Sequence, residues 1–442
     1  VIASFAIYLL VARSDAHKLR SVADFFLYLR RLGPQKVFGT FYASGMSLAT
    51  VFIAFMQLAP AFGVSLIWAA LFYALGHVVL YALIPRIRGF ATSGSTLHGF
   101  LAQSYDSHPL RLTASIATSM GFIGIFSTEL IVGTHLLTAL LPNVQGYLPS
   151  LLVVATVVVA YSILGGFKSV VRTDVIQTYA VIFVCGLMVA LAFRFGAKDV
   201  GGPIIEPDLL RNWLLAPIGQ AKPSVIALMM LNFFLINVPF PLVDMSAWQR
   251  TIAARDEGAA KSGIRLAIVM FLVTWSAILF AALALGESST ADTTGGLATV
   301  LLRLGSEGWF GLILCALGFA ALVAAMLSTA DSFLIASGQT VAMDITDRPF
   351  FDNHPIEEAP DDDGEGALLP MDSEHRRVIG RARGHMAIIG LIGLGLCIGL
   401  QSIGFNVVAF VFAVYGSALA LAPAVLAALF LHRLFDLTCL RD

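Results

Sequence analysis

Long apolar stretches alternate with short polar segments along almost the whole chain. Each stretch comes close to the roughly 20 residues that an α-helix needs to cross the hydrocarbon core of a bilayer. The pattern therefore predicts an all-α integral membrane protein with ten spanning helices. Their approximate limits are residues 40–64, 67–86, 112–140, 147–165, 174–195, 224–246, 265–286, 309–340, 386–401 and 405–431.

An eleventh apolar stretch, residues 1–11, is too short to span a bilayer. The chain opens inside this stretch without a Met, and the stretch lacks the basic segment that begins a signal peptide. We therefore expect residues 1–12 to be the remainder of an earlier membrane helix. Residues 432–442 follow the tenth span, and we expect them to be a truncated C-terminal tail.

The composition agrees with a membrane protein. Of the 442 residues, 58% are hydrophobic and only 12% are charged, with a mean hydropathy of +0.85, which excludes an ordinary soluble domain. The chain contains no Gly-rich phosphate loop and no nucleic-acid motif, and its four cysteines lack metal-ligand spacing. We expect the lipid bilayer as a partner, no nucleic acid, no organic cofactor, no enzymatic activity and function as a monomer.

Lys and Arg residues indicate the orientation, because they concentrate in cytoplasmic loops. Residues 13–39 hold six of them, and later basic clusters, among them one that includes Arg250, fall on the same side. We therefore expect residues 13–39 to be a cytoplasmic loop and the N-terminus to lie outside, in a cell membrane such as the bacterial inner membrane. Residues 196–223 then form an extracellular loop, and the hydrophilic residues 352–383 are expected to form a flexible cytoplasmic loop.

Two of the predicted spans contain residues that interrupt a helix. Residues 41–47 are mostly small and include a glycine, and residues 237–241 contain two prolines. Broken backbone at membrane depth must line a cavity or a site, because hydrocarbon offers it no hydrogen bonds. Breaks five spans apart are typical of two five-helix repeats of opposite topology, here residues 40–195 and 224–431. The sequence thus predicts a binding site between the breaks, near the bilayer midplane.

A polar face interrupts the eighth span. Ala325, Ser328, Thr329 and Ser332 have the i, i+3, i+4, i+7 spacing of one helix face, and Asp331 lies beside them. These residues offer oxygen atoms, which small, hard cations prefer as ligands. The structural alternative for both Ser328 and Thr329 is a hydrogen bond to the carbonyl group four residues earlier.

Several segments resemble the sodium/solute symporter family, which includes bacterial proline, sugar and sialic acid carriers. The most specific segment is residues 165–167, Gly-Gly-Phe, followed by Thr173, Asp174 and Gln177. The resemblance implies a leucine-transporter-like fold of two inverted five-helix repeats. It also implies sodium-coupled symport, by alternating access, of a small organic solute such as an amino acid or a carboxylate. The matching segments are residues 32–34, 43–47, 165–177, 248–256, 325–332 and, more weakly, 415–423.

The resemblance further implies a principal sodium site between the first and eighth spans. The carbonyl groups of Ala43 and Met46 would face the carbonyl group of Ala325 and the hydroxyl groups of Ser328 and Thr329. Neutral ligands suit transport, since they leave no permanent charge when the ion departs. Sodium is the only metal ion that we expect.

A second sodium site exists in some members of the family, and Asp174, Ser328 and Ser332 match it. Asp331 stands where members with two ions have a hydroxyl residue, so it either strengthens cation binding or pairs with a nearby base, Lys168 or Arg172. Asp174 has an alternative role as the N-cap of the fifth span.

Polar residues near the two breaks are candidate contacts for the solute. Gly45 stands where sugar-transporting relatives carry a polar side chain, which argues against a polyol. Glu129 is an isolated acid in the third span, and it is either a proton or solute group or part of an interhelical hydrogen bond. Two other functions remain open: a proton-coupled carrier that uses Glu129 and Asp331, and a transporter-like sensor joined to a signalling domain. The candidate solute contacts are Gly45, Thr50, Gln57, Asn232, Asn237 and Tyr415.

Overall fold

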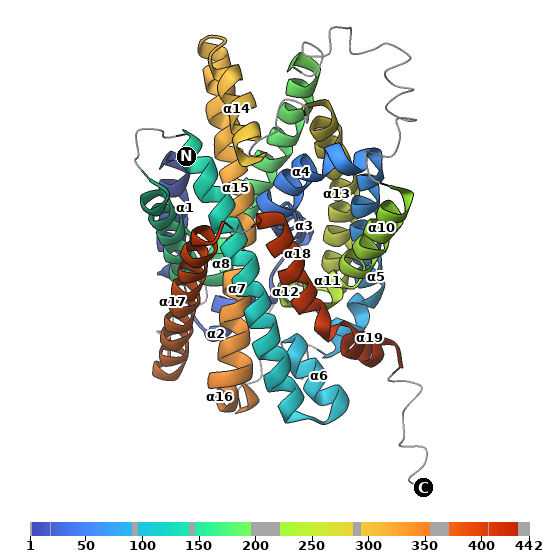
Figure 1. Ribbon diagram of the computed structural model, residues 1–442. Helices are drawn as coiled ribbons and strands as arrows, with labels where there is room; N and C mark the ends of the chain where they lie inside the picture. The colour runs from blue at the N-terminus through green and yellow to red at the C-terminus, as the bar shows by residue number, and fades with distance from the viewer. Residues whose placement is uncertain are drawn as a thin grey trace.

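The computed structural model describes residues 2–17, 19–90, 96–140, 146–195, 222–285, 293–353, 371–404 and 406–431. These residues are almost entirely helical (Figure 1), with an isolated β-bridge between Leu32 and Ala254. Eight helical runs in this part of the chain are long and apolar enough to cross a membrane. Two of them bend sharply, at Gly63 and at Gly166, and each of these two covers two predicted spans, so that the eight runs cover all ten.

The first half of the fold contains a helix that breaks and resumes. The chain leaves helical geometry after Gly45 and continues as a π-helical turn from Leu48. The elements are α1 (Ile2–Ala16), α2 (Val22–Leu27), η1 (Tyr28–Arg30), α3 (Pro34–Gly45), η2 (Leu48–Ile53), α4 (Ala54–Phe62), η3 (Gly63–Leu66), α5 (Ile67–Phe90), α6 (Leu97–Tyr105), α7 (His108–Leu140) and α8 (Tyr147–Phe195).

The second half repeats this design, because its first spanning helix ends at Asn237, just before Pro239. The first broken helix lies at the centre of the bundle, where α15 packs against α3, α7 and α8, whereas α10 lies at its edge against α5 (Figure 1). The elements are α10 (Pro223–Asn237), α11 (Phe240–Val243), α12 (Met245–Ala253), α13 (Glu257–Leu285), α14 (Thr293–Gly305), α15 (Trp309–Thr340), η5 (Val341–Thr346), α16 (Arg348–Asn353), α17 (Ser373–Ser402), α18 (Val407–Ala418), η6 (Leu419–Leu421) and α19 (Ala422–Leu431).

The segment 13–39 is not the loop that its basic residues indicated. It contains the end of α1, all of α2 and the first turns of α3. Phe25 and Phe26 of α2 are fully buried, and the Gln249 side chain of α12 donates a hydrogen bond of 2.8 Å to the Phe26 carbonyl. The apolar residues of this segment pack into the bundle. The loop prediction missed this because it rested on the basic residues alone.

The expected flexible loop 352–383 is also partly helical. α16 runs to Asn353 and α17 begins at Ser373, while residues 354–370 lie outside the described part of the chain, as do residues 196–221 and 432–442. Arg383 on α17 donates a hydrogen bond of 2.9 Å to the carbonyl group of Ile163. Arg383, one of the charged residues that made this segment hydrophilic, thus anchors α17 to α8.

Two helices lie outside the predicted spans. α6 begins after Thr96, whose hydroxyl accepts a hydrogen bond of 3.0 Å from the Gly99 amide. α14 packs against α15 (Figure 1). Both helices are shorter than a membrane span, so a search for apolar runs of spanning length misses them.

A glycine separates the fourth and fifth spans inside α8. Gly166 has φ +63° and ψ −159°, a backbone conformation that is almost exclusive to glycine. A Cβ atom there would lie 2.6 Å from the Phe25 ring and 2.7 Å from the Phe25 carbonyl oxygen. The turn therefore needs glycine both for its dihedral angles and for the close approach of α2.

We expect Gly166→Ala to destabilise the protein by at least about 1–3 kcal/mol, because the dihedral strain alone is of that order. The measurement is the apparent melting temperature in detergent. Gly186→Ala is the matched control, since Gly186 lies on the same helix and a Cβ atom there meets no other atom within 4 Å. Equal melting temperatures for the two variants would contradict the prediction.

Candidate functional site

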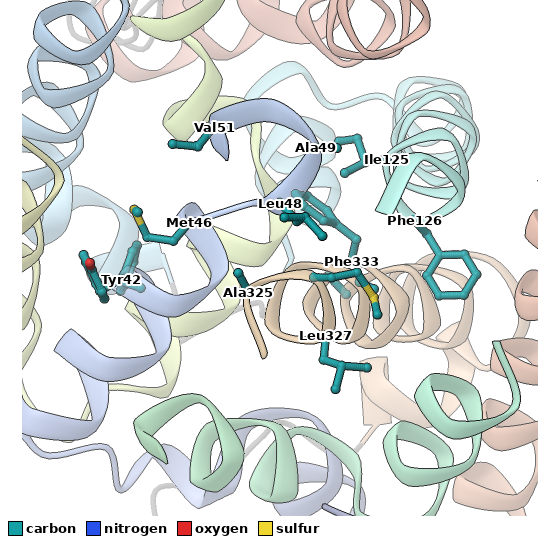
Figure 2. Packing of buried hydrophobic residues seen from close by; sticks show 14 of the residues in the cluster. Tyr42, Met46, Leu48, Ala49, Val51, Ile125, Phe126, Ala325, Leu327 and Phe333 are labelled. Carbon is teal, nitrogen blue, oxygen red and sulfur yellow. The ribbon is translucent and has the colours of Figure 1, made fainter. Parts of the chain in front are cut away.

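The break in the first spanning helix lies within the predicted segment. α3 ends at Gly45, Met46 leaves helical geometry with φ −102° and ψ 56°, and Ser47 is the N-cap of the turn that follows. Figure 2 shows the connection between Met46 and Leu48 with Ala325 of α15 close to it. The break therefore presents its backbone to the polar face of α15.

Two hydroxyl groups of α15 reach the carbonyl groups at this break. The Ser328 hydroxyl oxygen lies 2.9 Å from the Ala43 carbonyl oxygen and 3.0 Å from that of Ala325. The Thr329 hydroxyl oxygen lies 3.2 Å from the Ser44 carbonyl oxygen and 3.3 Å from that of Ala325. Each hydroxyl has a single proton for two acceptors, so the group holds more lone pairs than donors.

This oxygen group has the composition of a sodium site. It consists of neutral carbonyl and hydroxyl oxygens, which suit a small, hard cation. The sequence anticipated Ala43, Ala325, Ser328 and Thr329, and the structure brings these four together. It also adds the carbonyl group of Ser44, which the sequence did not indicate.

Met46 lies at the break itself and is fully buried. Its amide donates a hydrogen bond of 3.1 Å to the Ala43 carbonyl, and its sulfur accepts one of 3.4 Å from Thr274. Met46 therefore shapes the break beside the oxygen group.

A buried arginine lies among the residues expected to form a second sodium site. The Arg250 guanidinium of α12 donates to the hydroxyls of Thr40 at 2.9 Å and Ser332 at 2.5 Å, and one of its nitrogens lies 3.6 Å from an Asp174 carboxylate oxygen. The sequence placed Arg250 with the cytoplasmic basic residues, but it is fully buried. Its segment, 248–256, was noted for its family resemblance, and only packing shows that the charge points inward.

Asp174 is not the N-cap of the fifth span. It lies inside α8, eight residues beyond Gly166, and its carboxylate accepts a hydrogen bond of 2.5 Å from the Thr40 hydroxyl. The residue is fully buried, and one of its carboxylate oxygens has no hydrogen-bond partner in the described residues.

Asp331 does not pair with Lys168 or Arg172. It accepts a hydrogen bond from the hydroxyl group of Tyr161, and the Ser332 hydroxyl lies 3.3 Å from its other oxygen. The two basic residues pair with acids of the N-terminal helices instead: Lys168 lies 3.8 Å from Asp24 and Arg172 lies 2.5 Å from Asp15. Of the two alternatives for Asp331, the salt bridge is therefore absent, because Lys168 and Arg172 pair with acids of α2 and α1 instead.

Glu129 of α7 contacts the break at Ser47 and Ala49. One of its carboxylate oxygens accepts a hydrogen bond from the Ser47 hydroxyl and lies 3.4 Å from the Ala49 amide. Its other oxygen is buried and has no partner among the described residues. Of the alternatives that the sequence left open, the interhelical hydrogen bond is present.

A cavity lies between the two helix breaks. Gly45 and Thr50 line it from the first broken helix, Asn237 from the second, and Tyr415 from α18. Gln57 and Asn232 do not line the cavity, and Asn232 is exposed on the outer face of α10. The cavity is also lined by residues that the sequence did not indicate as solute contacts, among them Ser44, Ser47, Tyr73, Asp244, Ser246 and Trp275.

The chain belongs to the sodium:solute symporter family, whose model matches residues 25–353. The sodium/pantothenate symporter of Haemophilus influenzae is 25% identical over 291 residues, which cover 64% of this chain and 55% of that protein. The matched region therefore spans about half of that relative's length. The family resemblance seen in the sequence is confirmed, and the chain is a multi-pass membrane protein.

Two solved structures share the fold. A Na⁺-coupled sialic acid symporter in a substrate-bound, outward-open state gives a TM-score of 0.75 at 17% identity, over 97% of this chain and 85% of that chain. Mhp1, a nucleobase-cation-symport-1 family transporter in a closed conformation with bromovinylhydantoin bound, gives 0.60 at 13% identity, over 92% and 79%. The predicted leucine-transporter-like fold is confirmed.

We expect Arg250→Met to destabilise the protein by about 3–5 kcal/mol, because it leaves Asp174 buried without its positive partner. The apparent melting temperature in detergent measures the effect. Arg255→Met is the matched control, since Arg255 is exposed and, among the described residues, its side chain pairs with its neighbour Asp256 at the surface. Adding Asp174→Asn to Arg250→Met should restore part of the loss, and a double variant no more stable than Arg250→Met would contradict the account.

Proposed function

We propose that this protein is a sodium-coupled secondary active symporter that carries a small organic solute by alternating access. The observation that supports this most strongly is the group of oxygens formed where α15 meets the break after α3. A solute cavity lies directly beside this group, since Ser44 and Gly45 line the cavity. An ion bound there contacts both the broken helix and α15, so its presence favours one arrangement of the two.

The principal sodium ligands in this proposal are the carbonyl groups of Ala43, Met46 and Ala325 and the hydroxyls of Ser328 and Thr329. One sodium ion that moves down a membrane potential of 100 mV supplies about 2.3 kcal/mol, enough for about 50-fold accumulation of a solute. The second site, formed by Asp174, Ser328, Asp331 and Ser332, stays a prediction. The Arg250 guanidinium already contacts two of these residues, Ser332 and Asp174.

The solute class proposed from family breadth is an amino acid or a carboxylate, and the similarity to a sodium/pantothenate symporter keeps carboxylates in this range. We further propose that the protein works as a monomer in a bacterial inner membrane, with its N-terminus outside. Sodium is the coupling ion in this proposal, without an organic cofactor or covalent chemistry.

A proton-coupled carrier is the second candidate, because Glu129 is buried at the break with an unpartnered carboxylate oxygen. Solute uptake into proteoliposomes distinguishes the two. Uptake under an inward sodium gradient at symmetric pH supports the first proposal. Uptake that follows a pH gradient and ignores sodium would replace it with the second.

We expect Ser328→Ala and Thr329→Ala each to abolish most of the rise in melting temperature that sodium causes in the unmodified protein. Binding to the native state raises stability by about 2.7 kcal/mol at an ion concentration 100 times the Kd, and this increment depends on the ligands. Ser337→Ala is the matched control, since its hydroxyl is buried on the same helix but, within the described part of the chain, donates to the Phe333 carbonyl of its own helix, at 2.8 Å. If all three variants keep the full sodium response, the proposed site is wrong.

A further inference from the structure

Buried acids outnumber buried bases around the two helix breaks. Glu129, Asp174 and Asp331 are fully buried, and Asp244 is 8% exposed. The bases that the described structure places beside the breaks are Arg250, within 3.6 Å of Asp174, and His77, which lines the cavity.

Two helix ends beside the cavity, the starts of η2 and α12, are occupied by the protein's own carboxylates. The N-terminal end of a half-helix at a break attracts anions through its free amide groups. Glu129 takes this position at η2 through Ser47 and the Ala49 amide. Asp244 takes it at α12, where it accepts hydrogen bonds of 2.8 Å from both the amide and the hydroxyl of Ser246.

The arginine of the cavity wall is likewise committed. Arg250 lines the cavity, but its Nε donates to Thr40, one terminal nitrogen donates to the Ser246 carbonyl at 3.0 Å, and the other donates to Ser332. A solute carboxylate would therefore meet neither an open helix end nor a free guanidinium at this wall. It would also approach the carboxylate of Asp244, which lines the same cavity.

Aromatic rings form other parts of the cavity wall. Tyr73 stacks on Trp275 with ring centroids 4.6 Å apart, and Phe240 lies 4.6 Å from Tyr415. All four rings line the cavity. Aromatic faces attract cations, and the attraction is stronger where water is excluded. The Trp275 indole nitrogen is buried and has no partner in the described residues, so a ligand oxygen that reached it would satisfy its hydrogen bond.

We propose that the solute carries a positively charged nitrogen together with an oxygen acceptor. Its nitrogen lies against the aromatic rings and the Asp244 carboxylate, and its oxygen accepts from Trp275. This inference rests on the proposed symport function and narrows the solute class from amino acids or carboxylates in general to ammonium compounds and zwitterions.

Pairs of compounds of the same shape, in which a neutral carbon replaces the cationic nitrogen, test the preference for a positive charge directly. Choline is compared with 3,3-dimethyl-1-butanol, and glycine betaine with 3,3-dimethylbutyrate, in detergent with sodium present. We expect the charged member of at least one pair to raise the melting temperature at a concentration about tenfold lower than its carbon analogue. Equal responses, a stronger response to the carbon analogue, or no response to any of the four would overturn the proposal.

Asp244→Asn shows whether the acid at the second break provides this preference. Asparagine also caps helices well, so the variant should keep the α12 cap while losing the charge. We expect its preference for the charged compound to fall about tenfold. Asp256→Asn is the matched control, because Asp256 is exposed and its carboxylate accepts a hydrogen bond of 2.6 Å from the Ala259 amide near the start of α13. A preference that survives in Asp244→Asn would contradict the role of this acid.

Sodium alone, without any solute, separates the two levels of the proposal. A protein that sodium stabilises but that prefers the uncharged or anionic analogues keeps the proposed symport function and loses only the ammonium solute. A protein that sodium does not stabilise loses the proposed function itself.

Discussion

A helix that breaks inside a bilayer exposes carbonyl groups that find no water and must be satisfied by the protein. In this chain the carbonyl groups of Ala43 and Ser44 meet the hydroxyls of Ser328 and Thr329. Each hydroxyl has one proton for two carbonyl groups. These hydrogen bonds therefore close the break but leave carbonyl lone pairs without a donor. In the proposed function, a cation would replace these hydrogen bonds with direct coordination, which would make the position of α15 relative to the break sensitive to the ion. The proposed transport cycle depends on this contact.

The acids around the breaks have a related role. Glu129 and Asp244 each accept hydrogen bonds at the start of a half-helix, where amide groups would otherwise be free. They stabilise the two breaks from within the protein, but they also place negative charge beside the cavity. The same arrangement that holds the broken helices in place therefore favours a positively charged group in the space between them.

The Arg250 guanidinium connects several helices at the wall of the cavity. It bonds α3 through Thr40, α15 through Ser332 and its own helix α12 through the Ser246 carbonyl, and it lies near Asp174 on α8. Four helices thus share one buried charge, whose desolvation is offset only while these partners surround it. In an alternating-access cycle these are helices that would move relative to one another, so the cluster is suited to hold one closed arrangement.

The sequence by itself determined the membrane class, the ten apolar runs, the positions of both breaks and four residues of the oxygen group, since hydrophobic length, helix-breaking residues and hydroxyl spacing are local properties. Only the tertiary structure decided that Arg250 points inward, that the Ser44 carbonyl joins the oxygen group, that Asp331 bonds Tyr161 and that Asn232 lies outside the cavity. The physical reason is that lipid is as apolar as the packed interior. The hydrophobic pattern of a membrane helix therefore does not show which of its faces is buried, and the partners of its few polar residues depend on packing between segments far apart in the chain.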